Sequence, residues 1–137
     1  MLGDVDVFGR FDVTIDDKNI MILPAKTKVE AGEEVLIVSK AGAKYIVSRK
    51  FFDEYIEAIR KQIYNPLNKR DFIELLELYE SLCEMVIKQV KVDKQHRILV
   101  TDLYQPKGKG QIMGMGKMLK LINVTEEAPE EEQNKKR

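Results

Sequence analysis

Two short charged turns are the part of this 137-residue sequence whose residue types could do chemistry. The first is the run DDKN, from Asp16 to Asn19, and the second is DKQHR, from Asp93 to Arg97. Aspartate in a turn accepts hydrogen bonds from backbone N–H groups a few residues further along, which fixes the turn. Lysine and arginine carry donors that bind phosphate or the edges of bases. The pattern therefore indicates paired turns that bind a polyanion.

Catalytic and metal-binding interpretations of these residues are weaker. Asp16 and Asp17 could bind a cation or act as a general base, but aspartate in a turn between strands more often bonds its own backbone. His96 has no serine, cysteine or second histidine beside it in the motif, which favours a turn residue over a catalyst. One histidine and one cysteine give no zinc-ligand spacing. We expect a protein that is not an enzyme and holds no metal or cofactor.

Composition and charge narrow the class of protein. Apolar residues make up 44% and charged residues 34%, which is typical of a soluble globular domain, and no apolar run is long enough to span a membrane. The first ten residues carry acids and lack the apolar stretch of a secretory signal, so we expect a cytoplasmic protein. Residues 87–123 hold eight basic and two acidic side chains. Such a basic segment fits a polyanion partner, and a solvated lysine-rich sheet face explains it equally well.

Eight short strands are predicted to position the two turns, because apolar and polar residues alternate between turn signals. The strands cover residues 11–15, 20–23, 34–39 and 43–48 in the first half, and 88–92, 97–100, 110–115 and 117–122 in the second. Gly42 supplies a positive φ to the hairpin that joins the third and fourth strands. The sequence therefore places each charged turn between two strands.

Two amphipathic helices are predicted between the two sets of strands. Apolar residues recur at intervals of three and four from Phe51 to Ile63, and Pro66 ends this first helix. Asn68 is the expected N-cap of the second helix. The apolar stripe of the second helix is predicted to pack in the core, with its cysteine as a buried, unreactive thiol. This stripe consists of Phe72, Leu75, Leu76, Tyr79, Leu82, Cys83 and Val86.

The two halves of the chain repeat each other when Asp16 is set against Asp93, 77 positions later. The same offset matches Met21 with Ile98, and with a small gap the stretch GAKYIV lies over GKMLKL. A unit of four short strands has two open edges and too little core to stand alone, so two copies must pair. We expect a pseudo-twofold body whose matching turns emerge together and whose edges favour self-association. A duplex with regularly spaced phosphates suits such a surface.

The order of these elements resembles the MraZ family over roughly residues 8–122. The stretches that carry the resemblance are FGRFDVTIDDKNIMILPAK, the hairpin and two helices after it, and VDKQHRILV leading into GMGKMLKLI. The family motif is Asp, two residues, Gly or Asn, and then Arg, once in each half. The second copy keeps Asp93 and Arg97 and has His96 where Gly is usual. The first copy keeps the Asp and has Asn19, but Ile20 replaces the Arg.

The resemblance implies an α+β fold made of two pseudo-equivalent AbrB-like swapped-hairpin β units that form a small barrel, with a helical hairpin between them. The corresponding segments are residues 8–48 for the first repeat, 49–86 for the helical hairpin and 87–123 for the second repeat. Residues 124–137 are rich in charge and have almost nothing to bury, so we expect them to form a disordered tail.

The resemblance also implies a function. MraZ proteins are sequence-specific DNA-binding transcriptional regulators of the division and cell-wall gene cluster, which bind short direct repeats in promoter DNA as ring-like homo-oligomers. This implies a cytoplasmic, nucleoid-associated protein in which Arg97 contacts phosphate or bases, while Ile20 can do neither. The residues implied in DNA binding are Lys18, Lys26, Lys28, Lys94, His96 and Arg97, and the turn-structuring residues are Asp16, Asn19 and Asp93. The first-half lysines would supply charge without reading sequence.

A second hypothesis is a structural or adaptor oligomer of the same fold with weak or non-specific DNA binding. The missing arginine at Ile20 is the sequence evidence for it. The salt dependence of binding to upstream DNA separates the two hypotheses. The sequence leaves open the operator, the size of the ring, activation or repression, and whether Ile20 abolishes specific DNA binding.

Overall fold

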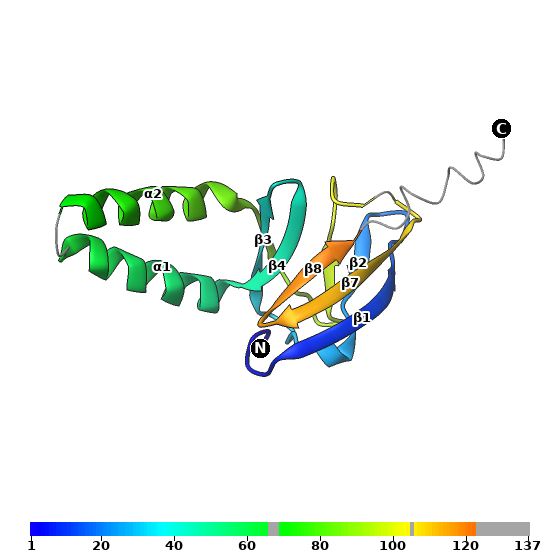
Figure 1. Ribbon diagram of the computed structural model, residues 1–137. Helices are drawn as coiled ribbons and strands as arrows, with labels where there is room; N and C mark the ends of the chain where they lie inside the picture. The colour runs from blue at the N-terminus through cyan, green and yellow to red at the C-terminus, as the bar shows by residue number, and fades with distance from the viewer. Residues whose placement is uncertain (66–68, 105, 123–137) are drawn as a thin grey trace, which may run out of the picture.

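The computed structural model of the chain describes residues 1–65, 69–104 and 106–122. Within these ranges the structure is mixed α+β, with a body of mostly antiparallel strands and two helices that project from one side of it (Figure 1). This confirms the α+β class expected from the sequence. The predicted helix end at Pro66, the N-cap at Asn68 and the tail over residues 124–137 lie outside the described residues.

The helices and strands follow the predicted order. They are β1 (Val7–Thr14), β2 (Ile20–Ile22), the short 3-10 helix η1 (Ala25–Thr27), β3 (Glu34–Lys40), β4 (Ala43–Ser48), α1 (Arg49–Tyr64), α2 (Lys69–Met85), β5 (Val86–Lys91), β6 (Arg97–Leu99), β7 (Lys109–Gly116) and β8 (Met118–Ile122). β1 begins well before the predicted strand. The sequence pattern does not indicate this earlier start, because the exposed Phe8 and Gly9, which has a φ of 103°, break the alternation of apolar and polar residues.

The described strands form two sheets. One has six strands in the order β1-β7-β8-β4-β3-β5, and the other is a two-stranded ribbon of β2 and β6. The order is symmetric, because exchanging β1 with β5, β7 with β3, and β8 with β4 gives the same order read from the other edge. The first strand of each half therefore pairs with the third strand of the other half, β1 with β7 and β5 with β3. Pairing among the described strands gives these two sheets and no closed ladder, and the small barrel stays a prediction.

Two pairs of residues mark the centre of this exchange. Met21 pairs with Ile98 in the ribbon, and these two residues are the 77-position counterparts of the sequence repeat. Tyr45 pairs with Lys120 at the centre of the six-stranded sheet, 75 positions apart. The ladders that flank this centre keep the same offset, since Ile37 pairs with Ile46 as Ile112 pairs with Leu121.

The predicted alignment of GAKYIV over GKMLKL is wrong by one residue, because the two hairpins place glycine at different turn positions. The β3–β4 turn has positive φ at both Ala41 (52°) and Gly42 (83°), as a type I′ turn requires. The β7–β8 turn has it at Gly116 (79°), which occupies the position of Ala41 and is typical of a type II′ turn. The positive φ predicted for Gly42 is confirmed.

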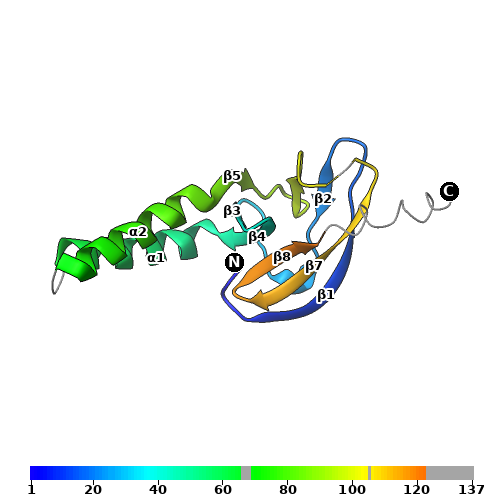
Figure 2. The same ribbon diagram turned by 45° about the horizontal axis from the view of Figure 1, so that its top comes forward.

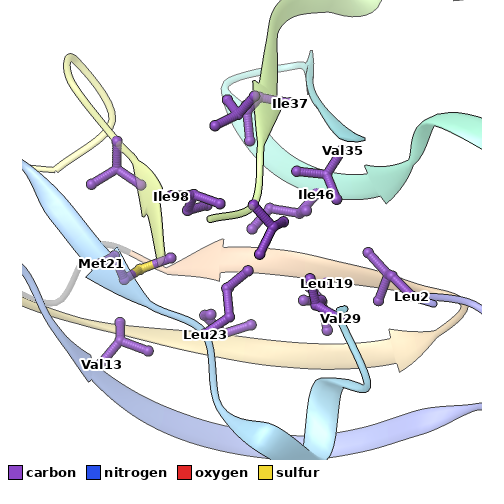
Figure 3. Close-up of a cluster of buried hydrophobic side chains, with 14 of the residues drawn as sticks. Leu2, Val13, Met21, Leu23, Val29, Val35, Ile37, Ile46, Ile98 and Leu119 are labelled. Atoms are coloured by element: carbon purple, nitrogen blue, oxygen red, sulfur yellow. The ribbon is translucent and has the colours of Figure 1, made fainter. Parts of the chain in front are cut away.

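The main core lies between the six-stranded sheet and the ribbon. Figure 3 shows Met21 and Ile98 of the ribbon directed into the same cluster as Ile46 and Leu119 of the sheet, and all four are at most 2% exposed. Burying each such side chain stabilises the fold by roughly 1.5–3 kcal/mol. This packing fixes the inner face of the ribbon and leaves its outer face free.

The helical hairpin extends away from the strands (Figures 1 and 2). Ser48 caps α1 by accepting a hydrogen bond from the N–H of Phe51 at 3.5 Å, and α1 buries Ile56 and Ile59. No residue of α2 is buried, and Cys83 is exposed. The predictions that the stripe from Phe72 to Cys83 packs in the core and that Cys83 is buried are therefore wrong. Val86, the last residue of the predicted stripe, lies in β5 and packs against the buried cluster of Leu36, Val38 and Val47. Periodicity shows which side of a helix is apolar, but not what covers that side.

Candidate nucleic-acid interface

The first charged turn is closed by Asp16. Its Oδ1 accepts hydrogen bonds from the N–H groups of Ile20 (3.0 Å) and Lys18 (2.8 Å). These hydrogen bonds lower the pKa of Asp16 below its ordinary value, and the bond from the Ile20 N–H has the larger effect. Asn19 adopts the left-handed region with a φ of 64°, which only a few residue types other than glycine do readily. The turn is thus held by backbone contacts to one carboxylate.

The second turn repeats this geometry and adds an ion pair. Asp93 Oδ1 accepts from the N–H groups of Gln95 (2.8 Å) and Arg97 (2.9 Å), and His96 has a φ of 62°. Arg97 Nε also donates to Asp93 Oδ2 at 2.8 Å. Desolvation acts to raise the pKa of Asp93, but the hydrogen bonds from Arg97 and Gln95 outweigh it and lower the pKa. The counterpart of Arg97 in the first turn, Ile20, can make no such pair.

The two turns lie at opposite ends of the ribbon. β2 and β6 are antiparallel, with Ile20 opposite Leu99 and Ile22 opposite Arg97. Each turn comes directly before its own strand, so antiparallel pairing directs the turns apart. Three residues per strand separate them by about 10 Å. The matching turns therefore lie at the two ends of one short ribbon, near enough for Arg97 of the second turn to lower the pKa of Asp16 in the first.

Each end of the ribbon is assembled from both halves of the chain. The N–H of Leu23, after β2, donates to the carbonyl oxygen of His96 in the second turn at 2.8 Å. In the same way the N–H of Val100, after β6, donates to the carbonyl oxygen of Asn19 in the first turn at 2.7 Å. The backbone that leaves each strand therefore continues beside the turn of the other half.

This crossing redistributes the lysines predicted from the sequence. The exposed Lys26 and Lys28 belong to the first half of the chain, but they follow Leu23 closely and lie on the segment beside the second turn. The exposed Lys107 comes to the first turn instead, because its N–H donates to the carbonyl oxygen of Asp16 at 3.0 Å. Lys107 is not among the DNA-binding residues predicted from the sequence. The sequence shows that its glycine-rich loop is basic but not which turn the loop lies beside.

The outer face of the ribbon is open to solvent. Both strands show the same burial pattern, with the middle residue buried and its neighbours partly or fully exposed. The outward residues are Ile20, Ile22, Arg97 and Leu99. Within the described part of the chain, Arg97 uses only its Nε in a side-chain hydrogen bond, so its two terminal amino groups have no protein partner there. The face thus offers one forked donor among aliphatic side chains.

Two buried hydroxyl residues support the ends of the ribbon at counterpart positions. Tyr104, near the first turn, places its hydroxyl 3.0 Å from the carbonyl oxygens of Gln111 and Ile122, to which it donates. Burial raises the pKa of Tyr104 to about 12. Thr27, near the second turn, donates its hydroxyl to the carbonyl oxygen of Pro24 at 2.6 Å. The first end is therefore anchored by a large side chain and the second by a small one.

Three other observations bear on the kind of partner. An apolar hollow of about 330 Å³ lies where the helical hairpin meets the sheet. It is lined by Val38, Val47, Phe51, Phe52, Tyr55, Leu82, Met85 and Met118. Among the described residues, no group of three or more His, Cys, Asp or Glu side chains could hold a metal ion. No helix in the described ranges is long and apolar enough to cross a membrane.

No family model and no curated protein matches the chain. What the site can do must therefore be argued from its geometry. That geometry is a two-stranded ribbon whose inner face is anchored in the core, whose outer face is exposed, and whose two ends carry basic side chains on fixed turns.

Proposed function

We propose that the chain is a sequence-specific DNA-binding transcriptional regulator of the MraZ family, with two pseudo-equivalent swapped-hairpin units that close into a small barrel. The observation that carries this proposal is the β2–β6 ribbon, with its exposed outer face and its rigid charged turns. The major groove of B-DNA is about 12 Å wide and admits a two-stranded β-ribbon. A rigid ribbon with cations at both ends suits that groove, because the cations can meet phosphates while the face meets bases.

The residues divide into two roles. Arg97 reads a base, since its terminal amino groups form a fork that matches O6 and N7 of guanine. Lys94, at the same end, and Lys18 and Lys107 at the other end contact phosphates. Phosphate contacts fix the register of the protein on the duplex, whereas the arginine carries the sequence information. His96 shapes the second turn and contacts no base.

Self-association is the second part of the proposal. The chain forms a ring-like homo-oligomer in the cytoplasm, at the nucleoid. This oligomer binds a set of short direct repeats upstream of the division and cell-wall gene cluster. The exposed apolar side chains of the helical hairpin support it, including Tyr64 (76% exposed) and Ile73 (45% exposed), together with the apolar hollow at its base. Several copies on several repeats gain affinity from the high local concentration.

A structural or adaptor oligomer is the alternative function. Two observations favour it, namely the aliphatic Ile20 at the motif position and the unburied apolar stripe of α2. In that function the helices bind partners and the ribbon binds DNA weakly or not at all. DNA-binding measurements separate the two proposals directly.

The test is the binding of the full-length chain to DNA upstream of its own gene, against scrambled DNA of equal length and composition, over a series of salt concentrations. The regulator prefers the upstream DNA and loses affinity steeply with salt. Lys107→Ala lowers the slope of log affinity against log salt by about 0.9, as expected for one lost phosphate contact. Lys50→Ala, an exposed lysine of α1, is the matched control and leaves the slope unchanged. Equal, weak binding of both DNAs leaves the adaptor function.

A further inference from the structure

Three of the four outward side chains of the ribbon are aliphatic. Ile22 is 60% exposed and Leu99 is 45% exposed, and Ile20 completes the group beside Arg97. Aliphatic groups on the same face as the only arginine of the ribbon are unsuited to phosphate, which needs hydrogen-bond donors. They suit a surface that presents methyl groups.

The four side chains form two rows. Ile22 stands opposite Arg97, and Ile20 stands opposite Leu99. Side chains directly opposite in an antiparallel pair have Cβ atoms about 4.5–5.5 Å apart, and residues i and i+2 on one strand are about 6.7 Å apart. Two base-pair steps of B-DNA also span about 6.8 Å. The two rows therefore match bases that are about two steps apart.

Thymine is the one base of unmodified DNA that presents a methyl group in the major groove, and guanine presents the O6 and N7 acceptors that suit arginine. We propose that the outer face of the ribbon reads thymine methyl groups beside a guanine. Ile22 and Leu99 contact C5-methyl groups, while Arg97 donates to a guanine within about two base-pair steps of them. This inference rests on the proposed DNA binding and adds the base preference of the same site.

The charges at the two ends favour DNA over a protein as the occupant of this face. Lys18 and Lys107 lie at the first turn beside the exposed Asp17 and Asp102. Lys94 lies at the second turn, where Arg97 pairs with Asp93, the acid of that turn. Basic side chains at both ends of an aliphatic strip match a groove with a phosphate backbone on each side. A second copy of this chain would have to supply acids opposite Lys94 and Arg97 at the second end.

The test uses duplexes enriched from a random library by the full-length chain. The tightest duplex is resynthesised with deoxyuridine in place of each thymidine in turn, which removes only the methyl group. We expect affinity to fall about fourfold for each contacted methyl. The guanine that Arg97 contacts is the one whose replacement lowers the affinity of the unaltered chain but not that of the Arg97→Ala variant. The thymines that are sensitive to loss of the methyl group should lie within about two base pairs of this guanine.

The protein side of the test uses Ile22→Ala and Leu99→Ala. Each variant should bind the thymidine duplex more weakly and bind the fully deoxyuridine-substituted duplex as the unaltered chain does. Ile87→Ala is the matched control, because Ile87 is 50% exposed on β5 outside the ribbon, and it should change neither affinity. A variant that fails to fold leaves the deoxyuridine measurement on the unaltered chain to decide.

Three results overturn the inference. Equal binding of thymidine and deoxyuridine duplexes removes methyl recognition but leaves the proposed DNA binding intact. Failure to enrich any duplex removes both proposals. A loss of oligomer mass in Ile22→Ala, with no change in preference for thymidine, assigns the outer face to a second copy of the chain.

Discussion

The two ends of the β2–β6 ribbon share a backbone and differ in their side chains. Both turns are closed by an aspartate that accepts two backbone N–H groups, and both have a left-handed residue, Asn19 (φ 64°) at the first end and His96 (φ 62°) at the second. At the next position the first end has Ile20 and the second has Arg97. The hydrogen bonds of the turn therefore set its shape, whereas the residue that follows can be isoleucine or arginine.

Charge differs between the ends as well. At the first end, Lys18 and Lys107 stand among the exposed acids Asp17 and Asp102. At the second end, the side-chain pair of Arg97 neutralises the one acid of the turn, and further lysines lie on the turn and on the segment beside it. The second end is therefore the more basic of the two, and the proposed DNA binding depends on it more.

The largest expected difference between the ends is structural, and it tests their buried anchors. Tyr104→Ala should lower the free energy of unfolding by about 3–5 kcal/mol, because it removes a buried aromatic ring. Thr27→Ala should lower it by about 1 kcal/mol, since it removes one buried hydroxyl hydrogen bond. Urea denaturation of both variants measures the contrast. Equal losses would contradict the view that the first end depends on its large side chain.

Tyr104 also makes a prediction for alkaline pH. Burial raises its pKa from 10.0 to about 12, so the folded state holds the neutral phenol more tightly than the unfolded state does. This contribution to stability is complete below pH 10 and is lost as the pH rises towards 12. Tyr104→Phe should remove this part of the alkaline loss, as measured by urea denaturation over that range. An unchanged profile in the Phe variant would assign the loss to other groups.

The motif position gives the next largest effect. Arg97→Ala should weaken specific DNA binding by about 1–3 kcal/mol and reduce the difference between operator and scrambled DNA. Ile20→Arg should strengthen specific binding, if the first end faces DNA as the second does. Fluorescence anisotropy on both duplexes measures these changes. If Ile20→Arg has no effect while Arg97→Ala abolishes binding, only the second end reads DNA.

The ion pair of Arg97 with Asp93 requires a control for that result. Arg97→Ala could lower binding by loosening the turn, and it would then lower thermal stability or oligomer mass together with affinity. Arg97→Lys keeps the charge but loses the fork, so it should retain affinity for scrambled DNA and lose preference for the operator. Equal preference in the Lys variant would show that the fork does not read a base.

A smaller effect is expected at the left-handed positions. His96→Gly should raise the free energy of unfolding by about 0.5–1 kcal/mol, because glycine adopts a positive φ without steric cost. Asn19→Gly should gain less, since asparagine enters this region more readily than most residues. Thermal denaturation compares the two variants. A loss of stability in His96→Gly would show that the imidazole makes a stabilising contact.

The smallest expected effect concerns acid. Both Asp16 and Asp93 have pKa values below the ordinary 3.8, so their contribution to stability is present above that pH and is lost as the pH falls through the lowered values. Asp16→Asn and Asp93→Asn keep an acceptor oxygen but cannot titrate, and each should make stability less dependent on acid pH. Urea denaturation above and below pH 3.8 measures this slope. A slope that neither substitution changes would contradict the role of these carboxylates.

The parts of the fold that could be predicted from the sequence are those set by neighbouring residues. Strand β4 (Ala43–Ser48) has the predicted bounds, because alternation and the turn at Gly42 define it locally. The two helices follow from their apolar period in the same way. The depth of burial depends on residues far away in the sequence. The local pattern therefore predicts that the stripe containing Cys83 packs in the core, although the helical hairpin extends away from the core.

The candidate site divides along the same line. The turn role of Asp16 and Asp93 follows from the preference of aspartate for its own backbone, which needs only the local sequence. The placement of Lys26 and Lys107 depends on how β2 pairs with β6, and short strands of three residues carry too little pattern to specify their partners. The local sequence therefore predicts the turns but not the groups that surround them.

The pairing of Met21 with Ile98 has a consequence for the symmetry of a duplex that the ribbon would bind under the proposed function. A residue that meets its own counterpart across an axis is the arrangement of two identical subunits, which must present the same side chain at both ends and so favour palindromic sites. Two similar halves in one polypeptide are free of that requirement, because their residues need not be identical. Ile20 and Arg97 differ at counterpart positions in this way. The ribbon therefore has a direction, and under the proposed function such a face suits sites that repeat head to tail.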